Sequence, residues 1–190
     1  ADAEEQFGPE VALLIDGVTK LDRIKFSSRE LAQAATIRKM AVAMAKDIRV
    51  LLIKLADRTH NMRTIDPLPE EKRRRVASET LDVYAPLAHR LGVQEIKHEL
   101  EERSFAALHP ARRRSLEEQI RQRAPEREMY LERVMAEVGS ALENAGIKAT
   151  INGRPKLVYS IYRKMVESGL EFGEIHDLIG IRIIVPEVRD

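Results

Sequence analysis

The sequence predicts a mainly α-helical chain that is followed by the start of an α/β domain. Through most of the sequence, apolar residues recur at spacings of three and four, the period of a helix that buries one face. After Gly146 apolar and polar residues alternate, as in a half-buried strand, and a second apolar run follows near the C-terminal end. We therefore place a domain boundary near His109-Pro110, with a helical part over residues 1–109 and a part over residues 110–190 that opens in β-α-β order.

Three apolar patterns open the helical part. The first two lie on either side of Asp16-Gly17-Val18-Thr19-Lys20, which we expect to be a turn. They are marked by Val11, Leu14 and Ile15 before the turn and by Leu31, Ala34, Ala35 and Met44 after it. In the third, residues 50–56 are apolar enough for a buried strand, but the continuation through Met62 favours a buried helix.

Proline and glycine divide the rest of the helical part. A further helical face is formed by Val76, Thr80, Val83, Tyr84 and Leu87. Pro86 should kink or restart this helix because proline has no backbone N–H, and Gly92 is suited to end it. One more helix holds Ile96 and Leu100, and His109-Pro110 breaks the pattern.

The second part begins with a long helix and then changes period. The helix carries the apolar stripe Leu131, Val134, Met135, Val138 and Leu142 and ends at Gly146. Residues 147–152 then alternate as a strand, and Asn152-Gly153 is expected to supply a turn. Residues 178–185 form a second strand. The helix between the strands is marked by Val158, Ile161, Tyr162 and Met165 and ends at Gly169.

Composition excludes several classes of protein. Among 190 residues, 32 lysines and arginines nearly balance 31 aspartates and glutamates, so no overall basic field attracts nucleic acid. The basic runs at 72–75 and 112–114 have acidic neighbours, which favours solvated helix faces. The absence of cysteine excludes a disulfide framework and a thiolate zinc site, and no apolar run has the length of a membrane span. We expect a soluble cytoplasmic protein with no membrane partner and no direct DNA binding.

Three polar residues form a first candidate site. If residues 48–64 are helical, Asp57, Asn61 and Thr64 lie at i, i+4 and i+7 on one face. A carboxylate can ligate a divalent cation, and an amide and a hydroxyl can hydrogen-bond a sugar, a base or a phosphate. The alternative is a solvated polar face with ordinary ion pairs, and the spacing alone leaves both interpretations open.

A second candidate site combines an extended basic segment with the start of a helix. Arg154 and Lys156 lie two residues apart, and Ser160 and Lys164 lie at i and i+4 on the helix that follows. These groups can converge near the helix N-terminus, where free N–H groups and the helix dipole favour phosphate. A polyphosphate would suit that arrangement, and a helix with an exposed basic face is the alternative.

Two charged residues accompany the last apolar run. Arg182 interrupts the run, where a charge is costly to bury unless it is paired or faces a ligand cleft. Asp177 precedes the run and offers a carboxylate for magnesium. Strict alternation would send the two side chains to opposite faces, so a shared site requires Asp177 to lie outside the regular strand.

Residues 53–64, which read IKLADRTHNMRT, resemble the last metal-site helix of the HD-type hydrolase domain in long RelA/SpoT-type proteins. The resemblance continues through FGPEVA, DGVTKL and IRKM before this helix and ETLDVYAPLAHRLG after it, and covers almost the whole chain. It implies that Asp57 is a ligand of the hydrolase manganese and that Asn61 and Thr64 line the guanine nucleotide pocket. In such a site the metal activates a water that attacks the 3′-pyrophosphate. Thr59 stands where the family usually has leucine.

The resemblance also has consequences for activity. Retention of Asp57, His60 and Asn61 implies the bifunctional type, because synthetase-only relatives have degraded this stretch. The arginine-lysine pair, first histidine, His-Asp doublet and Glu-Asp pair that family members carry upstream have no counterpart in these residues. One carboxylate cannot hold a catalytic manganese. We therefore expect an HD-type helical hydrolase remnant with a bridging helical bundle, truncated at both ends and without hydrolase turnover.

The C-terminal part resembles the synthetase domain of the same family. That domain has a nucleotidyltransferase-like fold and transfers pyrophosphate from ATP to the 3′-hydroxyl of GDP or GTP. The resemblance implies that Arg154 and Arg182 sandwich the ATP adenine and that Asp177 binds magnesium. The implied phosphate contacts are Lys156, Ser160 and Lys164. A second metal-binding or base glutamate and a guanine-stacking tyrosine lie beyond Asp190 in family members, so we expect no complete synthesis reaction either.

The parent protein implied by this resemblance makes and destroys (p)ppGpp. Its cofactors would be Mn2+ for hydrolysis and Mg2+ for synthesis, its ligands guanine nucleotides and ATP, and a ribosome could bind only through regions beyond these residues. Three alternatives stay open: a non-catalytic regulatory or structural fragment, a synthetase-only relative with a vestigial hydrolase half, and another HD-type phosphohydrolase. The stretch 57–64 argues against the second, and the third leaves residues 153–164 unexplained.

Overall fold

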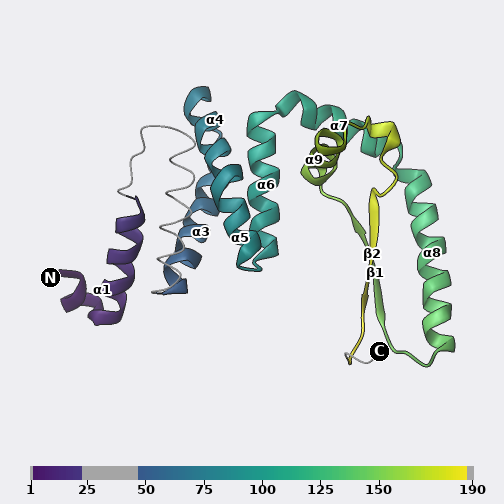
Figure 1. Cartoon of the computed structure of the whole chain (residues 1–190), viewed down its shortest axis with the longest axis horizontal. Helices are drawn as coiled ribbons and strands as arrows, with labels where there is room; N and C mark the ends of the chain where they lie inside the picture. Colours follow the sequence, from purple (N-terminus) through teal and green to yellow (C-terminus); the bar gives the residue numbers. More distant parts are fainter. Residues whose placement is uncertain (1, 23–46, 188–190) are drawn as a thin grey trace. The chain divides into compact units, whose positions relative to one another are not determined.

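The computed structural model describes residues 2–22 and 47–187. The chain divides into two compact units, Ala1–Leu108 and His109–Asp190. The described part of the first unit contains helices and no strand, and the second unit combines helices with one two-stranded sheet (Figure 1). The predicted class, mainly α with the start of an α/β fold, is confirmed. The helix expected over residues 31–44 lies outside the described residues.

Helix α1 (Asp2–Asp22) runs through the segment that the sequence indicated as a turn. The helix bends at Gly8, whose φ of 81° and ψ of 168° suit glycine and no helical residue. Residues 16–20 continue the helix, so the expected turn there is wrong. A Cβ atom at Gly17 would lie 2.9 Å from Cγ2 of Val50 in the next described helix, so this glycine serves close helix packing.

Helix α3 (Ile48–Arg63) confirms the helical interpretation of the apolar run. Asp47 caps its N-terminus, because the side chain accepts a 2.9 Å hydrogen bond from the N–H of Arg49. The apolar residues that α3 buries are Val50, Leu51, Leu55 and Met62. Burial of this one face leaves the other side of the helix, which carries Asp57 and Asn61, exposed.

The next helical stretch changes its hydrogen bonding around Pro86. Helix α4 (Glu70–Glu79) passes into a π-helical turn, η1 (Thr80–Tyr84), and then into α5 (Ala85–Arg90), which has Pro86 in its first turn. The N–H of Ala85 bonds to the carbonyl of Thr80, five residues back. Proline has no N–H with which to continue the ordinary ladder, and the wider π-turn lets the chain stay helical. Instead of breaking the helix, Pro86 coincides with a change from π-helical to α-helical hydrogen bonding.

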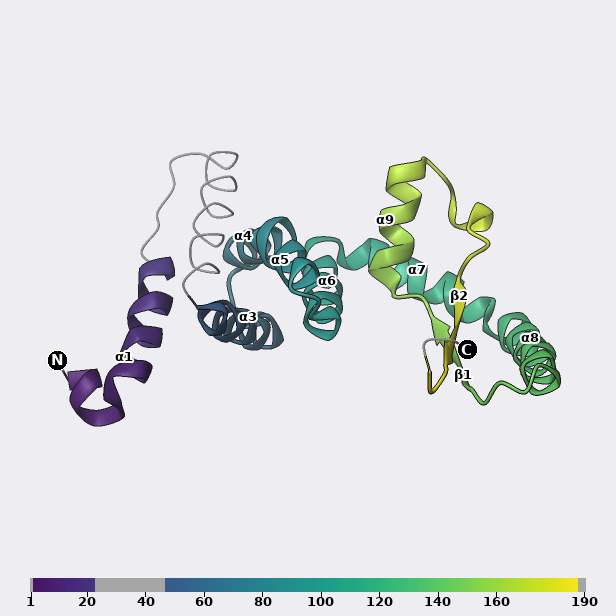
Figure 2. The same ribbon diagram turned by 60° about the horizontal axis from the view of Figure 1, so that its bottom comes forward.

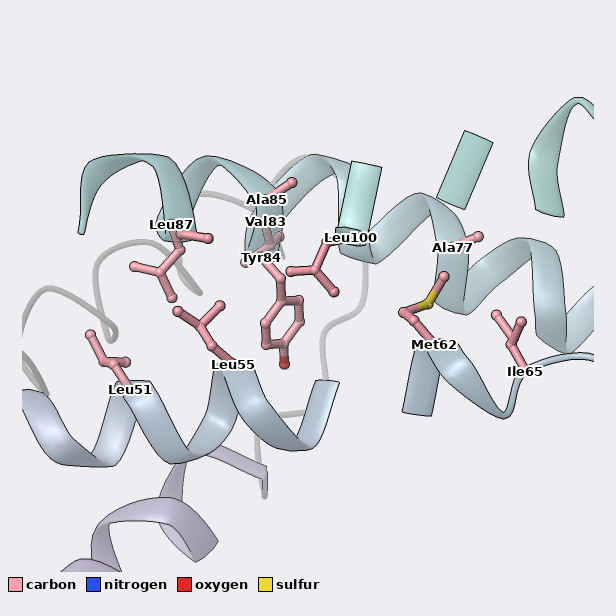
Figure 3. Close-up of a cluster of buried hydrophobic side chains, with 11 residues drawn as sticks. Leu51, Leu55, Met62, Ile65, Ala77, Val83, Tyr84, Ala85, Leu87 and Leu100 are labelled. Atoms are coloured by element: carbon pink, nitrogen blue, oxygen red, sulfur yellow. The ribbon is translucent and has the colours of Figure 1, made fainter. Parts of the chain in front are cut away.

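The core of the first unit lies between α3 and the helices that follow it. Gly92, with a φ of 74°, separates α5 from α6 (Gln94–Leu108), as expected. Figure 3 shows α3 side chains facing those of η1, α5 and α6. The cluster includes Leu51, Leu55, Met62, Ile65, Ala77, Val83, Tyr84, Ala85, Leu87, Ala88 and Leu100. Burial of each leucine or methionine contributes about 1.5–3 kcal/mol, so the core fixes how α3 presents its polar side.

The second unit builds an antiparallel ribbon between helices. Its elements are α7 (Pro110–Gln122), α8 (Ala124–Asn144), β1 (Thr150–Pro155), α9 (Val158–Ser168), a 3-10 turn η2 (Phe172–Glu174) and β2 (Ile179–Ile184). Helix α8 packs along the ribbon and α9 packs against α7 (Figures 1 and 2). Gly169, with a φ of 65°, ends α9 as expected. Among the helices described here, none is long and apolar enough to cross a membrane.

The expected turn at Asn152-Gly153 is wrong, because both residues lie inside β1. A side chain at Gly153 would clash with Leu131 of α8, so the glycine lets the strand pass close to that helix. The predicted alternation over residues 147–152 is present as alternating half-buried and exposed side chains.

Candidate functional site

The exposed side of α3 brings Asp57 and Asn61 together. We refer to Asp57, Asn61 and Thr64 as the Asp57 face. The Nδ2 group of Asn61 donates to Oδ2 of Asp57 over 3.3 Å, and Nζ of Lys54 lies 3.4 Å from the same oxygen. The Asp57 side chain is 50% exposed, whereas that of Lys54 is only 9% exposed. The helix thus presents a carboxylate and an amide to solvent, with a nearly buried ammonium behind them.

The hydroxyl groups of Thr64, in the Asp57 face, and of Thr59, in the core behind it, bond to backbone carbonyls. Thr64 is the C-cap residue of α3, and its Oγ1 donates to the carbonyl of His60 over 3.2 Å. Thr59 is buried and donates to the carbonyl of Leu55 over 2.7 Å, which satisfies its hydroxyl inside the core. Thr59 therefore fits a position where the family usually has leucine, while the Thr64 hydroxyl is engaged at the helix end.

Arg58 ties α3 to the π-helical turn, a contact that the sequence did not indicate. Its guanidinium lies 3.3 Å from Oε2 of Glu79 and 4.0 Å from the centroid of the Tyr84 ring, and its side chain is 13% exposed. A guanidinium over an aromatic face is attracted by the ring electrons. No local sequence pattern reveals this contact, because the partners lie on a different helical stretch.

Arg63 and Glu99 join the end of α3 to α6. Nε and Nη2 of Arg63 donate to the two carboxylate oxygens of Glu99 over 2.7 and 2.6 Å, and Nε of Arg103 adds a third bond of 2.8 Å. The hydrogen bonds from Arg63, with a smaller contribution from Arg103, hold the pKa of Glu99 down at about 2. This ion pair and Arg58 together fix the end of α3 that carries the Asp57 face.

The described residues do not complete a metal site around Asp57. Nowhere in ranges 2–22 and 47–187 do three or more His, Cys, Asp or Glu side chains gather where they could hold a metal ion. A protein-bound catalytic metal needs several such ligands, whereas Asp57 pairs with the ammonium of Lys54. Within the described residues, the Asp57 face therefore offers one carboxylate as a metal ligand.

A second cluster forms where the ribbon meets α9. We refer to Lys156, Lys164 and Asp177 as the Asp177 cluster. Lys156 follows β1 and Asp177 precedes β2, and the N–H of Lys156 bonds to the carbonyl of Leu178 over 3.0 Å. Nζ of Lys164 lies 2.6 Å from Oδ1 of Asp177, and Nζ of Lys156 bonds to Oδ2. One carboxylate therefore bridges the ammonium groups of two elements that are separate in the sequence.

The environment of Asp177 suits an anion between cations. Hydrogen bonds from Lys156, and then from Lys164, lower the pKa of Asp177 to about 2. Because each oxygen already accepts from an ammonium group, Asp177 could bind a magnesium ion only after its carboxylate leaves the two lysines. Asp177 precedes β2 and lies outside the regular strand. The sequence analysis required this position if Asp177 and Arg182 were to share a site.

The other predicted residues of this half lie nearby in the fold. Asn152 pairs with Arg182 across the ribbon, so Arg154, two residues along β1, lies on the same face as Arg182 and diagonal to it. Both arginines are exposed. Ser160 is half-buried, one helical turn before Lys164, and no side chain caps the start of α9. The ribbon face and the helix start thus gather basic and N–H groups in one unit.

Sequence comparison matches two regions of the chain to known families. Residues 1–94 match the family described as HD domain, and residues 153–190 match the region found in RelA / SpoT proteins. The bifunctional (p)ppGpp synthase/hydrolase RelA of Mycobacterium tuberculosis is 54% identical over 174 residues, which cover 92% of this chain and 23% of the relative. The chain belongs to the RelA/SpoT family. The Asp57 face lies in the HD domain match, and the Asp177 cluster lies in the RelA/SpoT match.

Other RelA/SpoT relatives carry names for single activities. A GTP pyrophosphokinase of Streptomyces coelicolor is 56% identical over 189 residues, with 100% of this chain and 22% of the relative covered. A guanosine-3′,5′-bis(diphosphate) 3′-pyrophosphohydrolase of Haemophilus influenzae is 50% identical over 187 residues, which cover 98% of this chain and 28% of the relative. The chain thus spans between 22% and 28% of the length of these relatives. An HD-type hydrolase match indicates dependence on a divalent metal ion.

Proposed function

We propose that this chain comes from an enzyme that both hydrolyses and synthesises (p)ppGpp. The hydrolase would release pyrophosphate from (p)ppGpp with Mn2+, and the synthetase would transfer pyrophosphate from ATP to GDP or GTP with Mg2+. The observation that carries the proposal is that each matched region holds its own cluster of polar side chains, the Asp57 face in one and the Asp177 cluster in the other.

In the HD half, the proposed nucleotide-binding residues are Asn61 and Thr64, and Asp57 is one proposed manganese ligand. Support comes from the direct contact between Asp57 and Asn61 on the exposed side of α3. The intact stretch from Asp57 to Thr64 argues against a synthetase-only relative with a vestigial hydrolase half. The proposed hydrolase assignment covers residues 1–109, with the bridging helices included.

In the synthetase half, assigned to residues 110–190, the proposal rests on basic side chains of the two-stranded ribbon and of α9. The proposed adenine and phosphate contacts are Arg154, Arg182, Lys156, Ser160 and Lys164, and Asp177 is the proposed magnesium ligand. Support comes from the shared ribbon face of the two arginines and from the pairing of both lysines with one anion. The two ammonium groups match the charge of a polyphosphate.

We further propose a cytoplasmic enzyme whose ligands are guanine nucleotides and ATP, with no membrane or direct DNA partner. A ribosome would bind, if at all, through other regions. The near balance of basic and acidic residues, 32 against 31, supports the absence of a general nucleic-acid surface. For the 190 residues alone we propose no turnover, which makes them a non-catalytic fragment when isolated.

The test uses the protein encoded by the complete gene and, beside it, the 190-residue chain. Each is incubated with manganese and ppGpp, and separately with magnesium, ATP and GDP, and nucleotide products are separated by ion-exchange chromatography. We expect both products from the complete protein and neither from the chain alone. A complete protein with only one of the two activities would contradict the bifunctional proposal, and product from the isolated chain would contradict its assignment as a non-catalytic fragment.

A further inference from the structure

The Asp177 cluster holds its two lysines together without any ligand. Lys156 comes from the end of β1, Lys164 comes from α9, and each donates to a different oxygen of the Asp177 carboxylate. Two neighbouring ammonium groups repel each other unless an anion lies between them. The Asp177 carboxylate is that anion, and it lies between the two ammonium groups.

We propose that Asp177 is an internal substitute for substrate phosphate, and that a bound polyphosphate displaces its carboxylate from Lys156 and Lys164. This inference rests on the proposed role of the two lysines as phosphate contacts. It assigns Asp177 a positioning role toward the lysines, in addition to the magnesium role that the family resemblance implies. Displacement would also leave the carboxylate accessible to a cation, which the lysines exclude in the present arrangement.

The exposure of the cluster makes such an exchange feasible. The side chains of Lys156, Lys164 and Asp177 are 35%, 41% and 46% exposed, so a ligand reaches them from solvent without unfolding the unit. Exposed ion pairs are weak in water, whereas a polyphosphate brings several charges to the same two donors. The carboxylate therefore organises the lysines at a small energetic cost to the ligand that replaces it.

The experiment measures binding of inorganic tripolyphosphate by calorimetry to the complete protein, in EDTA and without metal. If Asp177 competes with phosphate, D177N should bind tripolyphosphate about threefold to tenfold more tightly than the unaltered protein, since the competing ion pairs are exposed. D177A serves as a second variant and should show the same gain. D177E, which keeps a carboxylate near the lysines, should return the affinity toward that of the unaltered protein.

E167Q is the matched control for loss of one negative charge. Glu167 lies on α9 near Lys164 but pairs with Arg163, 3.6 Å away. If loss of any nearby negative charge were enough, E167Q and D177N would gain affinity for tripolyphosphate equally. That result would overturn the proposed exchange of carboxylate for phosphate. Unchanged or weaker binding of tripolyphosphate to D177N and D177A would overturn it too.

K156A and K164A separate failure of the exchange from failure of the proposed phosphate site. If neither lysine variant weakens tripolyphosphate binding, the assignment of Lys156 and Lys164 as phosphate contacts is wrong, and the proposed exchange is wrong as well.

Discussion

The Asp57 face and the Asp177 cluster each centre on one carboxylate, but the two carboxylates are held in different ways. Asp57 lies on a helix fixed by a buried core, and its contacts with Lys54 and Asn61 are long, at 3.4 and 3.3 Å. Asp177 lies outside the regular elements and is held by two close lysines. The core positions the first carboxylate and leaves it open to a ligand, whereas charge positions the second and occupies both of its oxygens.

The largest expected effect comes from removing the core behind the Asp57 face. Leu55 is fully buried, so Leu55→Ala should destabilise the first unit by about 2–5 kcal/mol. The stability of the second unit should change far less, because Leu55 belongs to the core of the first unit. Amide hydrogen exchange of α3 and α8 peptides in the complete protein measures both units separately.

Leu52→Ala is the matched control on the same helix. Leu52 is 40% exposed, and its loss should change stability by no more than about 0.5 kcal/mol. Equal exchange in α3 for the two variants would show that the buried core does not position the Asp57 face.

A smaller effect is expected from acid acting on Glu99. Its pKa of about 2 lies below the ordinary value of 4.5, so its bonds to Arg63 and Arg103 stabilise the fold fully above about pH 4.5. That contribution is lost as the pH falls from about 4.5 towards about 2. Glu99→Gln should therefore cost about 1 kcal/mol at pH 6 and progressively less below pH 4.5.

Pulse-labelled hydrogen exchange of α6 peptides in urea gives the unfolding midpoint at each pH. Glu95→Gln, on the exposed first turn of α6, is the control for loss of one carboxylate and should lower the midpoint at pH 6 by less than Glu99→Gln does. A constant difference between Glu99→Gln and the unaltered protein from pH 6 to pH 3 would exclude the ion pair as the cause.

The smallest expected effect on stability comes from Asp177→Asn. Its ion pairs are exposed, so their loss should destabilise the second unit by only about 0.2–1 kcal/mol at low salt. The difference should shrink further near 1 M salt, because salt screens exposed charges. Hydrogen exchange of α9 peptides at two salt concentrations measures it, and a loss of several kcal/mol would mean that the cluster is part of the scaffold.

The sequence was informative where a pattern is local. Periodicity identified α3 and the second strand, and Gly169 marked the end of α9. It placed the first strand over residues 147–152, three residues before β1, which runs from Thr150 to Pro155. The spacing of Asp57 and Asn61 also predicted their contact, because i and i+4 lie on one side of a helix.

Prediction failed where a residue serves a contact that is distant in the sequence. Gly17 and Gly153 were both interpreted as turn residues, yet each lies inside a regular element and makes room for Val50 or Leu131 of a neighbouring helix. Glycine allows both uses, and only the packing partner separates them. For the same reason the bridge from Asp177 to two lysines was not foreseen, since three separate segments form it.

The central claim is that one chain contributes to two separate nucleotide sites. Both reactions should be assayed on the same preparations of the complete protein with Asp57→Asn, Lys164→Ala and the exposed controls Asp66→Asn and Lys148→Ala. We expect Asp57→Asn to lower ppGpp hydrolysis more than about tenfold and to spare synthesis, Lys164→Ala to do the reverse, and the controls to change neither. Equal loss of both reactions in either variant, or loss of neither, would contradict the claim.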